Sequence, residues 1–336
     1  MSRIIYSCDR GVMEYDQSSG EHHRILDAEI YPIWFRAEPM RPFFINEKIL
    51  IYDGEGSEHC LHAYSISKKR DTCVSFRIRS ANHFIKDGII YFACGDDAGS
   101  VLTSMPLDFV DYLLGHIGIS EVGESVRTWI AYYQENKDIS WFQGLKTLAR
   151  GTKTPFYYGA CGIYYTEKEE EATRLFFRSY QGAVKVIGHE ESKGDANCQA
   201  IENIRESEGK VYYLVNRRRN HSNQQVIMTI HPDGQIQELA VFDAHHRAFY
   251  NAIYQFEVTK NFLAFRMRQK DQDFVRILNS DNRCILCEEN IKASALFCVG
   301  DDLLLSTRNN GTYIYIAHKN KILPFTSLEV TGAQYI

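Results

Sequence analysis

Few residues in this sequence have the types and spacing that enzyme or metal chemistry requires. Cys284 and Cys287 form a Cys-x-x-Cys pair, but in the strand expected there positions i and i+3 face opposite sides. No second cysteine pair completes a zinc site. Histidines cluster at 22–23, 59–62 and 245–246, and their spacing does not show convergence on one point. Patterns for nucleophile elbows, phosphate loops and dinucleotide binding are absent. We therefore assign no catalytic residue, no metal ligand and no cofactor.

The most polar segments are short tips between apolar runs. Arg217, Arg218 and Arg219 make one tip basic, and Glu167–Glu171 make the equivalent tip of the preceding repeat acidic. If equivalent tips emerge on one face, acid covers the earlier repeats and base the later ones. Such a face favours electrostatically steered binding of a partner protein, and three arginines can also hold a phosphate. The alternative is a set of solvated tips whose opposite charges only screen each other.

Composition and charge exclude several classes of protein. The chain has 336 residues, of which 44% are hydrophobic and 24% charged, so it carries enough apolar material for a core. The net charge of −5 disfavours nucleic acid as a partner. No apolar stretch approaches the roughly 18 residues of a membrane span, and the first residues lack a signal-peptide core. Nine scattered cysteines are typical of buried thiols, which predicts a cytoplasmic protein.

A repeating unit of short apolar runs organises the chain. The 21 Tyr and 19 Phe favour strands, and each unit offers three strands separated by polar tips or turns. Most units follow the last at roughly 40–50 residues, the period of propeller blades, and one wider step signals an insertion. The lead runs start near Ile4, Ile49, Ile89, Ile163, Val211, Phe262 and Leu303.

A fourth strand precedes most lead runs, as at Ile33–Arg36, 81–85, 253–258 and 294–299. The first unit lacks one, and the C-terminal segment 328–336 is spare. Placing that segment in the first unit closes a ring without a free inner edge. We therefore predict an all-β, seven-bladed β-propeller as a single domain, residues 1–336, with ring closure by the C-terminal strand. A β-sandwich pair and a β-helix are the alternatives.

The lead motifs carry a resemblance to known repeat proteins. Gly88-Ile-Ile-Tyr-Phe, Gly162-Ile-Tyr-Tyr and Lys210-Val-Tyr-Tyr resemble the repeats of YWTD-type β-propellers and their bacterial relatives. The Trp-Asp dipeptide of WD repeats is missing, no unit spells YWTD in full, and there is no sialidase-type Asp-box. The resemblance therefore implies an architecture and leaves the function open.

Residues 108–150, between the third and fourth units, change from period 2 to period 3.6. Apolar residues at helical spacing predict three short amphipathic helices, the last stopped by Gly151. This three-helix insertion contains Trp129, Tyr133 and Trp141. Its aromatic residues either anchor the insertion on the propeller or form a docking element for another protein.

The sequence thus predicts a non-catalytic scaffold that binds a partner protein, with no membrane role and nucleic acid disfavoured. The partner-binding residues are predicted to be Trp129, Tyr133, Trp141, Arg217, Arg218 and Arg219. The alternative is a propeller enzyme, a hydrolase or lyase, with a metal-dependent or metal-free site at the mouth of the central tunnel. The partner, the process and the oligomeric state are not encoded in any motif.

Overall fold

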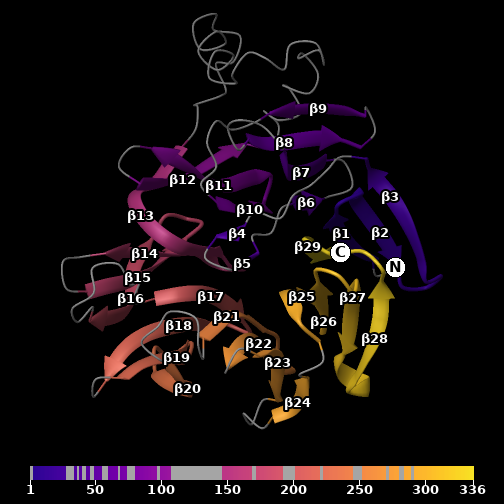
Figure 1. Cartoon of the computed structure of the whole chain (residues 1–336). Coiled ribbons are helices and arrows are strands. Elements are labelled where there is room, and N and C mark those ends of the chain that lie inside the picture. Colours follow the sequence, from indigo (N-terminus) through magenta and orange to yellow (C-terminus); the bar gives the residue numbers. More distant parts are fainter. Residues whose placement is uncertain are drawn as a thin grey trace, which may run out of the picture. The chain divides into compact units, whose positions relative to one another are not determined.

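The chain forms antiparallel β-sheets in two compact units (Figure 1). The computed structural model describes residues 3–27, 34–35, 38–39, 43–45, 49–54, 60–66, 69–73, 80–96, 99–106, 146–168, 172–191, 201–219, 222–244, 252–269, 272–279, 284–288 and 291–336. The first unit contains Met1–Phe35, Pro39–Gly151 and Thr331–Ile336, and the second contains Arg36–Glu38 and Thr152–Val330.

The first sheet of the first unit joins the two ends of the chain. Its strand order is β29-β1-β2-β3, with β1 at Arg3–Cys8, β2 at Gly11–Asp16, β3 at Glu21–Leu26 and β29 at Gly332–Tyr335. Strands β29 and β1 are antiparallel, with Tyr335 opposite Ile4. The hydroxyl oxygens of buried Ser7 and Thr331 lie 2.8 Å apart. The C-terminal segment therefore supplies the fourth strand of this sheet.

The remaining strands of the first unit follow in chain order. One sheet contains β6 (Phe43–Ile45), β7 (Ile49–Gly54), β8 (Cys60–Ser65) and β9 (Arg70–Cys73), and two short strands, β4 (Trp34–Phe35) and β5 (Glu38–Pro39), pair with each other. Next come β10 (Ser80–Lys86), β11 (Ile89–Asp96) and β12 (Gly99–Pro106). The partner of β7 is β6, so the strand that we predicted at Ile33–Arg36 does not fill that place.

The second unit contains four successive meanders. Strand β13 (Lys146–Tyr158) starts in the first unit, next to β12 in a seven-stranded sheet that runs in order from β10 to β16. It pairs in the second unit with β14 (Gly162–Lys168), which is followed by β15 (Ala172–Ser179) and β16 (Val184–Glu191). The next sheet contains β17 (Ile201–Ser207), β18 (Lys210–Arg219), β19 (Ser222–Ile230) and β20 (Ile236–Ala244). Then come β21 (Ala252–Val258), β22 (Phe262–Gln269), β23 (Gln272–Asn279) and β24 (Cys284–Glu288). The last sheet contains β25 (Ala293–Val299), β26 (Asp302–Thr307), β27 (Thr312–Ile316) and β28 (Lys321–Thr326), with a short 3-10 helix, η2 (Ala317–Lys319), before β28.

Tight turns join the first two strands of several sheets. Glu208 and Gly209 have φ angles of 50° and 72°, and together they form the two-residue connection between β17 and β18. Positive φ at both positions matches the primed turns that suit the right-handed twist of a hairpin. Gly311 has a φ of 75°, and a Cβ there would lie 2.4 Å from the Thr326 carbonyl oxygen. Only glycine fits at this position.

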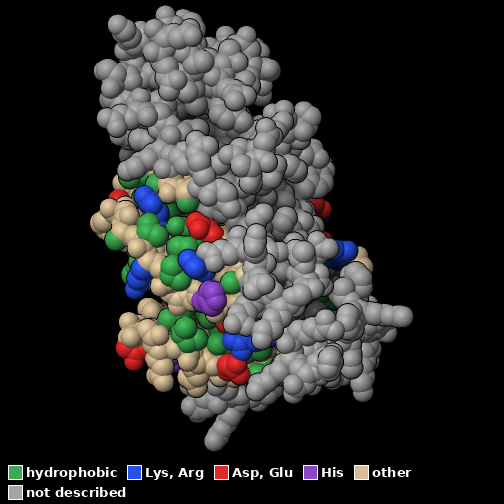
Figure 2. All heavy atoms as spheres, turned by 90° about the vertical axis from the view of Figure 1, so that its left-hand side faces the viewer, with side chains coloured by type: hydrophobic (Ala, Val, Ile, Leu, Met, Phe, Trp, Pro, Cys, Tyr) green, Lys and Arg blue, Asp and Glu red, His purple; other side chains and the backbone are tan. Residues whose placement is uncertain are grey.

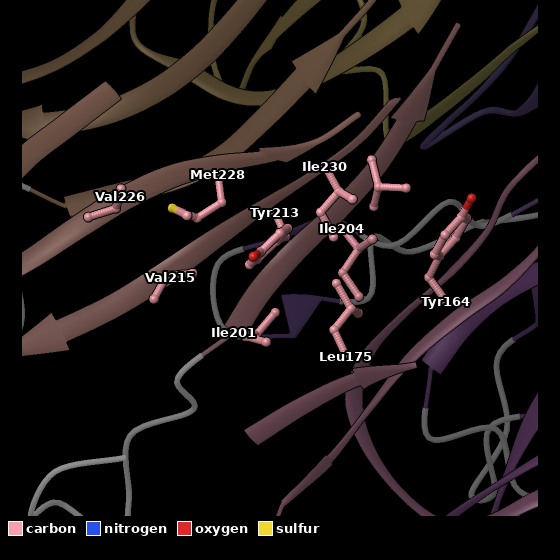
Figure 3. Packing of buried hydrophobic residues seen from close by; sticks show 10 residues of the cluster. Tyr164, Leu175, Ile201, Ile204, Tyr213, Val215, Val226, Met228 and Ile230 are labelled. Carbon is pink, nitrogen blue, oxygen red and sulfur yellow. The ribbon is translucent and has the colours of Figure 1, made fainter. Parts of the chain in front are cut away.

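The hydrophobic cores of the second unit lie between successive sheets. Tyr164 and Leu175 of one sheet pack against Ile204, Tyr213 and Met228 of the next (Figure 3). Two further clusters repeat this arrangement between the later sheets, where Leu214 packs with Phe265 and Phe262 packs with Tyr315. The two middle sheets, β17–β20 and β21–β24, are therefore buried on both faces, which explains why their central strands read as nearly continuous apolar runs.

The predicted fold, a closed seven-bladed ring interrupted by three helices, is wrong as stated. No α-helix occurs in the part of the chain that the structure describes, and residues 146–151, where the third helix was expected to end, belong to strand β13. The rest of the predicted insertion, 107–145, lies outside the described residues. The sheets belong to two compact units rather than to one closed ring, although four-stranded antiparallel sheets are consistent with a propeller. Pairing with a neighbouring strand overrides a local helical pattern, because the strand gains long-range hydrogen bonds and burial.

Candidate functional site

We call the first strand of each meander in the second unit (β13, β17, β21 and β25) its inner strand. The β18–β19 hairpin extends beyond the inner strand β17. The pairing of β18 with β19 runs from Val211 opposite Ile230 to Arg219 opposite Ser222. The inner strand β17 pairs with β18 only as far as Val215. We call the projecting part, residues 216–225, the basic hairpin. Strand β20 pairs with β19 on the outer side as far as Asn223. Among the described strands, the hairpin therefore has a paired neighbour along this edge only.

Arg217 fastens the base of the basic hairpin to two other strands. Its Nε and Nη2 donate to the two carboxylate oxygens of Glu190 on β16, at 3.0 and 2.9 Å. Its Nη1 donates to Glu238 on β20. The hydrogen bonds to Glu190 raise the pKa of Arg217 above its usual value. Since Glu190 is only 9% exposed, this bidentate pair is shielded from water and its geometry is well defined.

A buried tyrosine lies beneath this ion pair. Tyr213, four residues before Arg217 on β18, is completely buried, and its hydroxyl has no hydrogen-bond partner. Burial raises the pKa of Tyr213, and the negative charge of Glu190 adds to the effect. Figure 3 shows Tyr213 beside Met228, whose sulfur lies 3.7 Å from Arg217 Nη2. Arg217, at the base of the basic hairpin, is therefore in direct contact with the hydrophobic core.

The other predicted partner-binding residues are only partly placed. Arg218 and Arg219 are the last two residues of β18, opposite Asn223 and Ser222. Trp129, Tyr133 and Trp141 lie outside the described residues, so their role stays a prediction.

The expected separation of acid and base is not the arrangement found around Arg217. Of the acidic tip, Glu167 is on β14, and 169–171 lie outside the described part of the chain. The acids that contact Arg217 come instead from the outer strands β16 and β20. In Figure 2, the coloured, described Lys and Arg side chains lie among acidic and hydrophobic ones and form no large patch of one sign.

Buried polar residues that no motif in the sequence indicates connect the inner strands of the second unit. Arg205 on β17 forms an ion pair with Glu257 on β21, at 2.9 Å, and their side chains are 14% and 4% exposed. The Arg205 guanidinium also lies 5.7 Å from the ring centroid of Tyr157 on β13. These three residues occupy equivalent places in their hairpins, opposite Tyr164, Tyr212 and Ala264. Three neighbouring inner strands are thus linked side by side.

Side chains also bond to the backbone of the next inner strand. Gln255 on β21 donates to the Leu296 carbonyl of β25 at 2.6 Å and accepts from the Leu296 N–H at 3.0 Å. Gln225 on β19 accepts from the N–H of Ile253, and Arg266 on β22 donates to the carbonyls of Ala293 and Ser294. All of these polar side chains are buried. They satisfy inner-strand groups that have no neighbouring strand to pair with.

The one sign of these hydrogen bonds in the sequence is the presence of polar residues within otherwise apolar strands, such as Gln255 and Glu257 on either side of Phe256. Their partners are 41 to 52 residues away, and no local spacing indicates such pairs. These polar groups join neighbouring sheets by hydrogen bonds and an ion pair. Among the described residues, no three His, Cys, Asp or Glu side chains gather in a way that could hold a metal ion.

In the described residues, no helix has the length and apolar character needed to cross a membrane.

Comparison with known proteins shows likeness in fold. No protein-family model matches this chain, and no curated protein does. Puromycin hydrolase matches with a TM-score of 0.57 and 10% identity over 97% of this chain. A prolyl endopeptidase structure matches with a TM-score of 0.54 and 9% identity over 97% of this chain. A putative 6-phosphogluconolactonase from Bacteroides fragilis matches with a TM-score of 0.53 and 11% identity over 100% of this chain. The chain spans 52% and 47% of the first two chains and 98% of the third.

These likenesses agree with the arrangement of the sheets. Successive four-stranded antiparallel meanders and the similar solved structures together support a β-propeller architecture. Identities of 9 to 11% show the fold alone. The architecture therefore leaves the activity open.

Proposed function

We propose that this protein is a non-catalytic scaffold that binds another protein, and that the basic hairpin is one of its contact surfaces. The observation that carries the proposal is the fastening of this hairpin by Arg217 to Glu190 and Glu238. A binding element that is already ordered loses less conformational entropy when its partner arrives. The buried side-chain links between the inner strands supply the rigid frame behind it.

The three arginines have different roles in this proposal. Arg217 is occupied by two carboxylates of its own chain, so it positions the hairpin and does not contact the partner. Arg218 and Arg219, at the end of β18, contact the partner. A guanidinium forms its strongest pairs with carboxylates or phosphates, so the partner surface is acidic.

The aromatic residues Trp129, Tyr133 and Trp141 are retained as a second contact surface. Tryptophan and tyrosine are enriched at the energetic centres of protein interfaces. A cytoplasmic location is part of the same proposal. Cys8 and Cys161, which form no disulfide in the described part of the chain, support a reducing compartment.

The enzyme alternative gains no support from the names of the similar structures. Puromycin hydrolase and the prolyl endopeptidases share only the fold with this chain, at 9 to 10% identity. On the inner strand β21, the buried acid Glu257 is paired with Arg205 and hydrogen-bonded by Gln255, so it acts as a structural group.

The test is affinity purification of the tagged protein from its native host, with the recovered partner identified and then purified. The double variant Arg218→Glu/Arg219→Glu should reduce the measured affinity for that partner by about tenfold or more, because two charge-assisted contacts become repulsive. The matched control is Lys319→Glu/Lys321→Glu, which makes the same charge change at two exposed residues near η2.

Equal loss of affinity in both double variants would mean that net charge, and not the hairpin, governs binding. Unchanged affinity in both would remove the basic hairpin from the interface. A separate variant, in which a Gly/Ser linker replaces residues 109–143 and β13 is kept intact, tests the aromatic surface. Full retention of the partner by that variant would exclude the aromatic surface.

A further inference from the structure

The Cys-x-x-Cys pair lies on β24, the last strand of its sheet (Figure 1). Cys284 is opposite Leu278 in the register of β23 and β24. Cys287 is opposite Arg276, so four residues of β24 span the length of three in β23. The extra residue, Ile285, forms a β-bulge. This bulge determines to which face of the sheet each cysteine position belongs.

Both cysteine positions lie on the same face of the sheet. Arg276 and Leu278 are two residues apart on β23, and alternate residues of a strand share a face, as do the positions opposite them. The opposite faces that the sequence predicted for Cys284 and Cys287 are therefore wrong, because that prediction counted every residue between them as regular strand. Positions two residues apart on a strand are separated by about 6.4–6.8 Å, and the Cα atoms of disulfide-linked cysteines by about 4.4–6.8 Å. The spacing is thus within the range of a disulfide.

The face that contains the cysteine positions borders the core cluster between the β17–β20 and β21–β24 sheets. Phe274 and Leu278, on this face of β23, belong to that cluster. The guanidinium carbon of Arg276 lies 5.4 Å from the ring centroid of Phe274. Its Nε atom is buried and has no hydrogen-bond partner among the described residues. The register therefore places a cation directly opposite Cys287, and a neighbouring cation favours the thiolate form of a cysteine.

We propose that Cys284 and Cys287 are a redox-sensitive dithiol, which glutathione disulfide oxidises to a disulfide across the bulge. The Cys287 thiolate attacks one sulfur of glutathione disulfide, which forms a mixed disulfide and releases one glutathione thiolate. Cys284 then loses its proton, attacks the Cys287 sulfur of the mixed disulfide and releases the second glutathione. In total the two cysteines give up two electrons and two protons, and the two glutathione molecules take them up.

The disulfide would fix the bulged register of β24. Among the described strands, β24 is paired along one edge only, and a slip of its register by one residue would exchange the two faces of the strand. A covalent bond between the positions on either side of Ile285 prevents that slip. In the reducing compartment proposed above, such a disulfide forms transiently, when the oxidant is present.

The test is oxidation of the folded, full-length protein with glutathione disulfide, followed by alkylation, trypsin digestion and mass spectrometry. Trypsin cleaves after Arg283 and Lys292, so one peptide contains both cysteines of the pair. We expect this peptide to be lighter by two hydrogen atoms and to contain neither glutathione nor the alkylating agent. The exposed Cys161 should carry one or the other. In Cys287→Ser, the remaining cysteine, Cys284, should behave as Cys161 does.

The isolated peptide 284–292 is the matched control for the effect of the fold. If the folded protein keeps two alkylated thiols, or takes up two glutathione molecules, under conditions that close the disulfide in the peptide, the fold separates the cysteines and the proposal is overturned. Arg276→Gln should slow closure by about threefold or more at low salt, because the thiolate loses its neighbouring cation. Arg10→Gln, in an exposed turn, should not change the rate. Equal rates in the two variants would exclude a role of Arg276.

Discussion

Arg217 was predicted from its charge to bind a partner, but in the structure it stabilises the hairpin. In the sequence it is the first of three adjacent arginines at a polar tip. In the structure it is fastened by a bidentate pair to Glu190 and by a further ion pair to Glu238. Contact of Arg218 and Arg219 with a partner stays a prediction. The run of charge in the sequence therefore indicated the position of the hairpin but did not show that Arg217 is used internally.

Replacement of Arg217 should lower stability. In Arg217→Ala, Glu190 is left with its hydrogen bonds unmade at a largely buried position, so we expect a loss of about 1–3 kcal/mol in the free energy of unfolding. Urea unfolding measures it, and Arg10→Ala in an exposed turn serves as the control. A loss no larger than that of the control would show that the ion pair does not anchor the hairpin.

Gly311 provides a second test at the residue scale. In Gly311→Ala, the new Cβ would meet the Thr326 carbonyl oxygen at 2.4 Å, in addition to the strain of a φ of 75°. Gly234 has a similar φ of 89° but open space around it. Gly311→Ala should therefore lower the free energy of unfolding by about 1–3 kcal/mol more than Gly234→Ala does. Equal losses would mean that the contact with Thr326 relaxes without cost.

At the scale of the elements, the inner strands depend on side chains from the neighbouring sheet. The inner strands β17, β21 and β25 each have a partner strand on one side only, so the backbone groups along their other edge need other partners. Gln255, Gln225 and Arg266 supply them from the adjacent sheet. Hydrogen bonds from the adjacent sheet therefore satisfy backbone groups along the unpaired edge of these strands.

Removal of one such link should be costly. Gln255→Met keeps the length of the side chain but leaves the N–H and C=O of Leu296 without their partner. We expect a loss of about 2–4 kcal/mol in the free energy of unfolding. Gln235→Met, at an exposed turn, is the control. A small loss in Gln255→Met would show that water replaces the glutamine.

The C-terminal strand should stabilise the N-terminal one. A chain that ends at Val330 lacks β29 and the Ser7–Thr331 hydrogen bond, whereas one that ends at Gln334 loses only two terminal residues. Hydrogen exchange of β1 should accelerate by about tenfold or more in the shorter chain and much less in the longer one. Similar exchange of β1 in both chains would contradict a stabilising role of β29.

At the scale of the whole molecule, the sequence predicted the hairpins better than their surroundings. Most predicted strands occur, because alternating apolar residues and turn residues act over a few positions. The prediction failed where two local patterns competed. Residues 146–148 continued a helical spacing, yet they pair in a sheet as part of β13. A short amphipathic pattern cannot reveal a partner strand that comes from elsewhere in the chain.

The sequence alone determined the class of structure: antiparallel hairpins in repeated units, with the basic hairpin among them and the C-terminal segment as a spare strand. Only the tertiary structure decided which polar residues are used internally. Arg205 and Glu257, and likewise Ser7 and Thr331, meet over separations of 52 and 324 residues. Such pairs depend on how whole sheets pack, because burial and not sequence spacing determines which polar groups must find each other.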